Sequence, residues 1–380
     1  MTTRLFEIAK AFLKLGFTAF GGPAAHVALM HGEFVERRKW VGEQEFLDML
    51  GAANLIPGPN STETALFVGF ARARWAGLVT AGVCFIAPAM VIVLALSWAY
   101  IEYGTAPAAG SLLYGIKPVV IAIILQALLG LGRRAVKGPL TALAGAAVLV
   151  LYFFRVNEIL LLLGGGLIVM ALKNRKRLWE IGRSRAATLA PLIGLAPLAA
   201  GAATPSRLFL AFFKIGSVMY GGGYVLFALL RADFVTRLGW LTDKQLVDAV
   251  AIGQVTPGPL FTSATFIGYL VGGVWGATVS TVGIFLPAFV LAALCSPFIG
   301  RMRKSVWAGS FLDGVNATAL GLMAAVTYVL GRAAFPDILA VGIGAAAFVL
   351  LVRFRVNPTW LILGGGLIGL LAGWLSALHH

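Results

Sequence analysis

The sequence predicts an all-α polytopic membrane protein with two homologous halves in an inverted-topology repeat and with broken or re-entrant helices. Three observations lead to this fold class. The 380 residues are 59% hydrophobic and only 12% charged, whereas soluble domains carry about 45–50% apolar and about 25% charged residues. The second half repeats the first in a fixed register. The basic residues between the apolar runs change sides from one half to the other.

The composition also excludes other classes of protein. Mean hydropathy is +0.91, which rules out a soluble globular domain and a disordered chain. The net charge of +15 arises from short basic clusters between apolar runs, as in the cytoplasmic loops of membrane proteins and unlike a nucleic-acid-binding stripe. Cys84 and Cys295 both lie in apolar runs and give no disulfide framework or metal-ligand spacing. We expect no cofactor, no metal site and no nucleic-acid partner.

The internal repeat sets the domain organisation. Pro57-Gly58-Pro59 corresponds to Pro257-Gly258-Pro259, and the stretch GGGLI at 164–168 returns at 364–368. A register held over this length indicates duplication. We therefore divide the chain into a first repeat at 1–172, a basic loop plus linker helix at 173–204, and a second, inverted repeat at 205–380.

Apolar segments suited to helices recur in the same order in each half, and about 20 apolar residues span a bilayer. They fall at 3–30, 49–71, 76–101, 110–131, 137–154 and 157–172, then at 207–230, 249–271, 276–298, 309–330, 336–352 and 357–377. The run 186–204 between the halves is either a further crossing or a surface helix. A crossing there would make the number of crossings between matched segments odd, which an inverted repeat requires.

Loop charges give the orientation. In the first half, basic residues collect at Arg72 and Arg74, whereas the loop 102–109 has none. In the second half this bias is exchanged: the loop that matches 102–109 carries Arg301, Arg303 and Lys304. The two halves are therefore expected to face opposite sides of the membrane. A parallel duplication with chance loop charges is the alternative.

The first two segments of each half are interrupted. Phe20-Gly21-Gly22-Pro23 and Pro57-Gly58-Pro59 break the first copy, and equivalent glycine and proline runs break the second. Proline removes a backbone donor and ends a helix, and freed backbone at membrane depth survives only inside protein or beside a wet cavity. A helix that starts after such a break has a partly positive N-terminus that binds anions. Kinks and close glycine packing are the alternative reading.

These breaks define a candidate anion site. Its expected lining is Lys14, Gly21, Gly22, Asn54, Pro57, Gly58, Asn60, Ser61, Thr62, Lys214, Gly221, Gly222, Gln254, Thr256, Gly258 and Thr262. The matched pair Lys14 and Lys214 would neutralise a dianion, or would snorkel to an interface. If they hold the anion, alanine at either position abolishes transport.

Two further residues are candidates for coupling. Glu63 has no matched carboxylate, since Ser263 occupies its place in the second half. It is either a proton carrier or a helix cap. His26 is a second coupling candidate, or else a hydrogen-bonded core histidine. Lys117 in an apolar run is a weaker candidate for lining the path.

The motifs resemble those of the chromate ion transporter family in its long, two-domain form. The matching stretches are FGGPAAHVALMHGEFVERRKW, NLIPGPNSTETALFVGF, YGGGYVLFALL and GQVTPGPLFTSATFIGYLVGG. The resemblance implies efflux of chromate across the cell inner membrane, chromate resistance, a proton gradient as driving force, and sulfate as a structural mimic. The family motifs fall on Phe20 to Pro23, His26, Asn54, Pro57 to Ser61, Glu63, Gly221 to Gly223 and Gln254 to Pro259.

Several functions remain open at this level. The cargo is chromate or a sulfate-like oxyanion, and a passive anion channel would use the same helix termini. An enzyme that acts on a lipid phosphate would need an acid–base or nucleophile constellation, and the sequence offers none beyond isolated Glu63 and His26, so we expect a transporter. The expected partners are the oxyanion and the lipid bilayer, and a homodimer is left open.

Overall fold

The computed structural model describes residues 2–20, 22–104, 106–175, 203–220, 223–299 and 306–378. Every regular element in these ranges is helical, so the all-α prediction is confirmed. The linker helix expected at 186–204 falls almost wholly outside the described residues.

The first repeat contains seven described α-helices and one π-helix. They are α1 (Thr2–Thr18), α2 (Gly22–His31), the π-helix η1 (Gly32–Arg37), α3 (Glu43–Ala53), α4 (Asn60–Tyr103), α5 (Pro107–Ala135), α6 (Pro139–Phe153) and α7 (Glu158–Lys173).

The second repeat follows the same order. It contains α9 (Pro205–Val218), η2 (Gly223–Val225), α10 (Leu226–Leu230), η3 (Arg231–Arg237), α11 (Asp243–Val255), η4 (Leu260–Thr262), α12 (Ser263–Cys295), η5 (Ser296–Phe298), α14 (Val306–Ala334), α15 (Ile338–Arg353) and α16 (Pro358–Leu378).

The long helices α4 and α12 are each two antiparallel segments joined by a sharp bend. The bend in α4 lies at Ala73 and Arg74, where Arg74 has a φ of 53°; the bend in α12 lies at Gly272 and Gly273, where Gly273 has a φ of 60°. The chain folds back on itself there, because the hydroxyls of Thr265 and Thr281, on opposite sides of the second bend, are 2.8 Å apart. The bends coincide with the gaps predicted between the second and third apolar segments of each half.

The broken first segments are also hairpins. The rings of Phe12 and Phe34, on either side of the first break, stack with centroids 4.8 Å apart. Phe212 and Phe234 form the matching pair at 4.7 Å. Each of these segments therefore enters the molecule and returns, as the broken or re-entrant helices of the predicted fold require.

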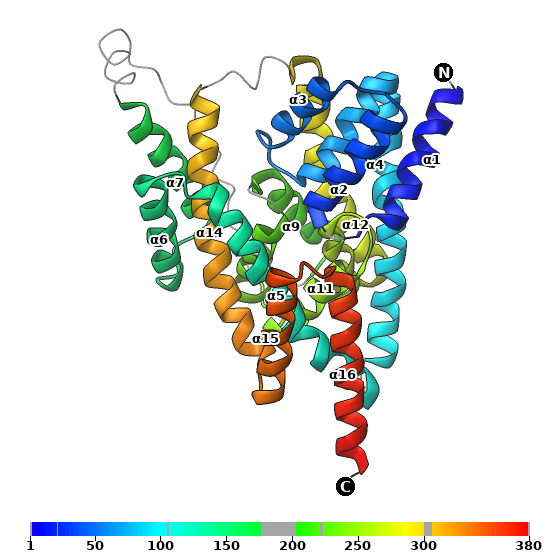
Figure 1. Cartoon of the computed structure of the whole chain (residues 1–380), viewed down its shortest axis with the longest axis vertical. Helices are drawn as coiled ribbons and strands as arrows, with labels where there is room; N and C mark the ends of the chain where they lie inside the picture. The colour runs from blue at the N-terminus through cyan, green and yellow to red at the C-terminus, as the bar shows by residue number, and fades with distance from the viewer. Residues whose placement is uncertain are drawn as a thin grey trace.

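The repeats run in opposite directions. In Figure 1 the long second segment of α4 descends, while the matched segment of α12 ascends; α5 ascends and its counterpart α14 descends. The inverted-topology repeat is thus confirmed.

The repeats are also interleaved. Helices α6 and α7 of the first repeat pack on α14 of the second, and α15 and α16 pack on α5 of the first. Glycines permit this close packing: a Cβ at Gly115 would lie 1.9 Å from the carbonyl oxygen of Gly365, and one at Gly314 would lie 2.8 Å from the Cα of Gly166. Neither repeat therefore completes its helix packing alone.

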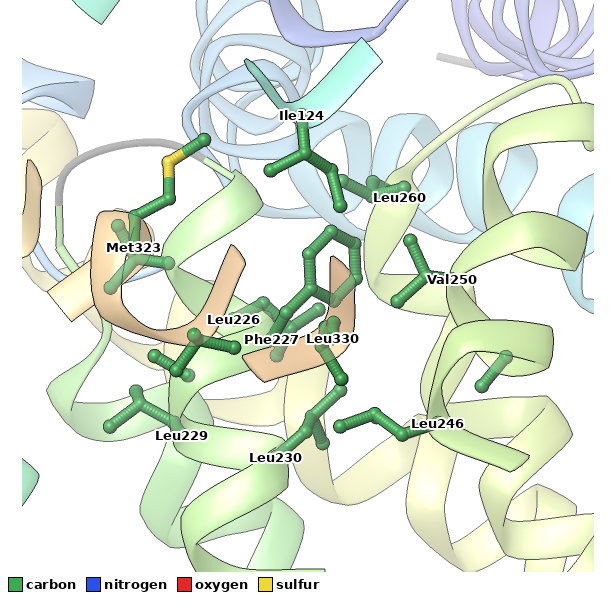
Figure 2. Packing of buried hydrophobic residues seen from close by; sticks show 14 of the residues in the cluster. Ile124, Leu226, Phe227, Leu229, Leu230, Leu246, Val250, Leu260, Met323 and Leu330 are labelled. Carbon is green, nitrogen blue, oxygen red and sulfur yellow. The ribbon is translucent and has the colours of Figure 1, made fainter. Parts of the chain in front are cut away.

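Apolar side chains fill the space between the helices. Figure 2 shows Phe227 of α10 among Leu246 and Val250 of α11 and Leu330 of α14, with Ile124 of α5 above it. Phe227 and Ile124 are each only 2% exposed. The core around α10 is thus shared by both repeats.

The outer surface is apolar, as a lipid-facing surface must be. Trp75 and Trp275, which follow the two bends directly, are 54% and 75% exposed. Tryptophan favours the membrane–water interface, so we expect the bends to lie at the two interfaces. By length and composition, five helices within the described ranges are suited to cross a membrane: Asn60–Tyr103, Ala108–Arg133, Leu260–Cys295, Gly309–Ala334 and Pro358–Leu375.

Candidate functional site

The interruptions of the two repeats meet at one place. The N–H of Gly58 donates to the carbonyl of Met219 at 2.8 Å, and the N–H of Gly258 donates to the carbonyl of Ala19 at 2.9 Å. Met219 and Ala19 are the residues just before the glycine breaks. The two bonds join equivalent residues of the two repeats in opposite directions. Each proline turn is therefore held by the glycine break of the opposite repeat.

Glycine is required at both proline turns. Gly58 has a φ of +142° and Gly258 a φ of +92°, conformations that side chains disfavour. A Cβ at Gly58 would lie 2.3 Å from Oε1 of Glu63, and a Cβ at Gly258 would lie 3.0 Å from Cβ of Ala89. The turns can therefore approach the neighbouring helices only because they carry no side chain.

A helix begins directly after the first proline turn. The carbonyl of Pro59 accepts from the N–H groups of Thr62 and Glu63, at 2.7 and 3.0 Å, and α4 starts at Asn60. The side chain of Asn60 donates to the amide oxygen of Asn54 at 2.5 Å, which ties the two arms of the hairpin together. The positive end of the α4 dipole thus lies at the meeting point of the four interruptions.

Three of the predicted site residues carry buried polar atoms without a hydrogen-bond partner among the described residues. They are Thr62 through Oγ1, Glu63 through both carboxyl oxygens, and Gln254 through Nε2. Glu63 and Thr62 are fully buried. Buried polar atoms are almost always paired in native structures, so these groups, one before a proline turn and two after one, are candidates for binding a polar cargo or a proton.

His26 joins two parts of this centre. Its Nε2 lies 3.0 Å from the carbonyl oxygen of Ala19 and its Nδ1 lies 3.4 Å from the hydroxyl of Ser61. The side chain is 1% exposed. Both ring nitrogens thus have neighbours, which favours the core-histidine interpretation over coupling.

The second repeat presents a less available set of hydroxyls. Thr256 donates to the carbonyl of Ile252, and Thr262 donates to the carbonyl of Pro259, at 2.7 and 2.8 Å.

Pro57 is partly buried in its turn, and Gly22 begins α2 with a φ of 78°. Gly21, Gly221 and Gly222 lie outside the described residues.

The two lysines have different surroundings. Lys14 lies on the exposed side of α1. Lys214 is 5% exposed and forms an ion pair with Asp233, which also pairs with Arg237. The structure does not bring the two amines together, because one faces outward and the other is neutralised by a carboxylate.

A buried polar cluster between the repeats was not foreseen. Nζ of Lys117 in α5 lies 2.9 Å from Oδ1 of Asp248 in α11, and the hydroxyl of Tyr100 donates to Oδ2 at 2.9 Å. Asp248 is fully buried. The sequence carries two signals here, Lys117 within an apolar run and Asp248 at the position that matches Asp48, but the two residues lie 131 positions apart and neither pattern pairs them. Within the described residues, no group of three potential metal ligands occurs.

Comparison with known proteins decides the family. The family model described as Chromate transporter matches residues 6–170 and 206–370, one match to each repeat. The chain belongs to the chromate transporter family. It is 32% identical to the chromate transport protein of Cupriavidus metallidurans over 384 residues, covering 100% of this chain and 95% of that protein.

Other chromate transporters show the same relationship. A probable chromate transport protein of Synechococcus elongatus is 32% identical and covers 97% of this chain and 90% of its own length. The chromate transport protein of Pseudomonas aeruginosa is 31% identical, with coverage of 97% and 92%. No solved structure matches the chain. This chromate transporter is thus a multi-pass membrane protein of a transporter family, and an oxyanion and membrane lipid are its partners.

Proposed function

We propose that this chromate transporter exports chromate across the cell inner membrane, coupled to the proton gradient, and thereby gives chromate resistance. The observation that supports the proposal is the meeting of four helix interruptions, two from each inverted repeat, around buried polar atoms that lack partners among the described residues. Inverted repeats with discontinuous helices are the architecture of secondary transporters that alternate access to one site.

The cargo site is proposed at this meeting point. A tetrahedral dianion needs donors from several directions, and the first turn of α4, the Gln254 amide and the Thr62 hydroxyl can provide them. The dipole of α4 contributes positive potential. Because Lys214 is paired with Asp233 and Lys14 is exposed, helix termini and neutral donors carry more of the proposed binding than the lysines.

Glu63 is the proposed proton carrier. It is fully buried at the start of α4, and neither carboxyl oxygen has a hydrogen-bond partner in the described part of the chain. A buried carboxylate without a partner is unfavourable. A carboxyl group in this position can therefore exchange a proton as the site opens to one side and then to the other.

Flux in proteoliposomes tests the proposal. We expect chromate to accumulate against its gradient when a pH gradient is imposed and an uncoupler to abolish this. Sulfate should compete. Sulfate accumulation without chromate movement would assign sulfate as the cargo. Flux that only follows the chromate gradient and ignores the uncoupler would indicate a passive channel.

A further inference from the structure

A cavity lies between the repeats. It has a volume of about 590 Å³ and is lined by the first glycine break, the C-terminal end of α5 and the turn between α15 and α16. Phe20 and Ala25 form its wall on the side of the break. The cavity thus reaches from the outer part of α5 to the first interruption.

Two arginines give this cavity a positive charge. Arg133 of α5 and Arg355 of the α15–α16 turn both line it and both are exposed. Within the described residues, neither guanidinium has an ion-pair partner, and no acidic side chain lines the cavity. Gln126 and Asn357 add amide donors to the same wall.

A second cavity, also lined by both repeats, is different in charge. It has a volume of about 460 Å³ and is lined by Arg155, which corresponds to Arg355, together with Arg231, Arg237 and Glu158. Arg231 is paired with Asp243 at 2.7 Å, and Arg237 is paired with Asp233. Glu158 and the carboxylates paired with Arg231 and Arg237 therefore offset the positive charge of this cavity, whereas no acidic side chain lines the first one.

We propose that the cavity of Arg133 and Arg355 is an outer binding site for the oxyanion, that is, a site peripheral to the central interruptions. The anion occupies it on the way to or from those interruptions. Guanidinium groups hold tetrahedral oxyanions through paired N–H donors. The identity of the cargo as an oxyanion rests on the proposed function. The assignment of the site rests on the cavity and its charge.

Chemical protection tests the site without a transport assay. Phenylglyoxal modifies exposed arginines, and mass spectrometry of the purified protein measures modification at each position. We expect sulfate or chromate to slow modification of Arg133 and Arg355. Arg353 is the internal control, because it is exposed, lies two residues away on α15, and contacts the ring of Phe354 outside the cavity. If the anion changes the modification rate of Arg133 and Arg355 no more than that of Arg353, the proposal is overturned.

Transport kinetics give a second readout. Arg133→Gln and Arg355→Gln should each raise KM for chromate about tenfold, since each removes a charged hydrogen-bond donor. The maximal rate should stay within about twofold, because each substitution weakens binding of the anion to the cavity but leaves the rate-limiting transport step unchanged. Arg353→Gln should leave both values unchanged. An unchanged KM in both cavity variants would contradict the proposal.

The two experiments separate the outer site from the proposed function. Anion protection of Arg133 and Arg355 in a protein that carries no chromate would support the cavity site and overturn chromate export. Active chromate transport by a protein whose cavity arginines are not protected would overturn the cavity site alone.

Discussion

At the scale of single residues, the two repeats have diverged at the start of the helix that follows each proline turn. Glu63 is matched by Ser263, whose hydroxyl donates to the carbonyl of Leu260 at 2.9 Å, whereas the carboxyl oxygens of Glu63 have no such partner in the described residues. One proline turn therefore carries an ionisable group and the other a hydroxyl already in use. A single acid on one side of a pseudo-symmetric centre is suited to carry one proton per cycle.

Glu63→Gln should uncouple transport from the pH gradient. The amide keeps the size of the side chain but cannot release a proton, so an imposed pH gradient should no longer drive chromate accumulation. Counterflow exchange of chromate should persist, and the measurement is flux in proteoliposomes with and without the gradient. Ser263→Ala is the matched control. A Glu63→Gln variant that still accumulates chromate in response to the gradient would remove Glu63 from coupling.

Gly58→Ala should destabilise the protein by about 1–3 kcal/mol, the range for a side chain forced into a rare backbone conformation. The added Cβ would also meet the Glu63 carboxyl group at 2.3 Å. Thermal unfolding in detergent measures the loss. Gly164→Ala is the control, because a Cβ there meets nothing within 4 Å. Equal unfolding temperatures for the two variants would show that the proline turn is not as constrained as described.

Lys14→Ala and Lys214→Ala should differ. Loss of the Lys214 amine leaves Asp233 with one cation fewer and should cost about 2 kcal/mol, as for a hydrogen bond to a charged group. Lys14→Ala, at an exposed position, should stay within about 0.5 kcal/mol of the original protein. Thermal unfolding and chromate flux are measured together. Lost flux with unchanged stability in Lys14→Ala would place that amine at the anion site.

At the scale of elements, the proline hairpin of the second repeat is fastened to spanning helices of the first by buried charge. The ion pair of Lys117 and Asp248 joins α5 to α11, and Tyr100 of α4 completes it. A buried ion pair adds little to the net free energy of unfolding, but removal of one partner is strongly destabilising because the other charge is left buried and unpaired. The cluster therefore fixes the position of the second proline hairpin against the first repeat.

Lys117→Met should lower the free energy of unfolding by about 3–5 kcal/mol, because it leaves a buried carboxylate unpaired. The double variant Lys117→Met with Asp248→Asn should recover most of that loss. A double-mutant cycle of thermal unfolding measures the coupling. Additive losses would mean that the two charges do not interact in the folded protein.

Sequence patterns predicted elements better than side-chain pairings. The bends at Arg74 and Gly273 fall where basic or glycine residues interrupt apolar runs, and the four interruptions were recognisable from proline and glycine at matched positions. The pairing of Lys214 with Asp233 was not recognisable, since it depends on which face of α9 meets η3. The contact between Lys117 and Asp248 depends on packing between repeats, which no local pattern encodes.

At the scale of the whole molecule, the repeats are interleaved rather than merely adjacent. The terminal hairpin of each repeat packs against a spanning helix of the other, as α16 does with α5 and α7 with α14. Glycine-to-glycine contacts allow the backbones to approach closely in both pairs. Each repeat thus depends on its counterpart to cover one of its spanning helices.

Separately expressed repeats should therefore associate when they are made together. A tag on the first repeat should recover the second from detergent extract, and either repeat alone should be degraded or aggregate. Gly115→Leu should abolish recovery, since even a Cβ at this position would lie 1.9 Å from the Gly365 carbonyl oxygen. Gly110→Leu on the same helix is the control, with nothing within 4 Å. Recovery that survives Gly115→Leu would contradict the interleaved packing.

The reciprocal bonds from Gly58 to Met219 and from Gly258 to Ala19 have a mechanical consequence. Each turn is anchored to the glycine break of the opposite copy, so displacement of one turn pulls on that break. In the proposed transport cycle, opening toward one compartment and sealing toward the second would then be a single concerted movement. Leakage through a state open at both ends would require both anchors to break at once.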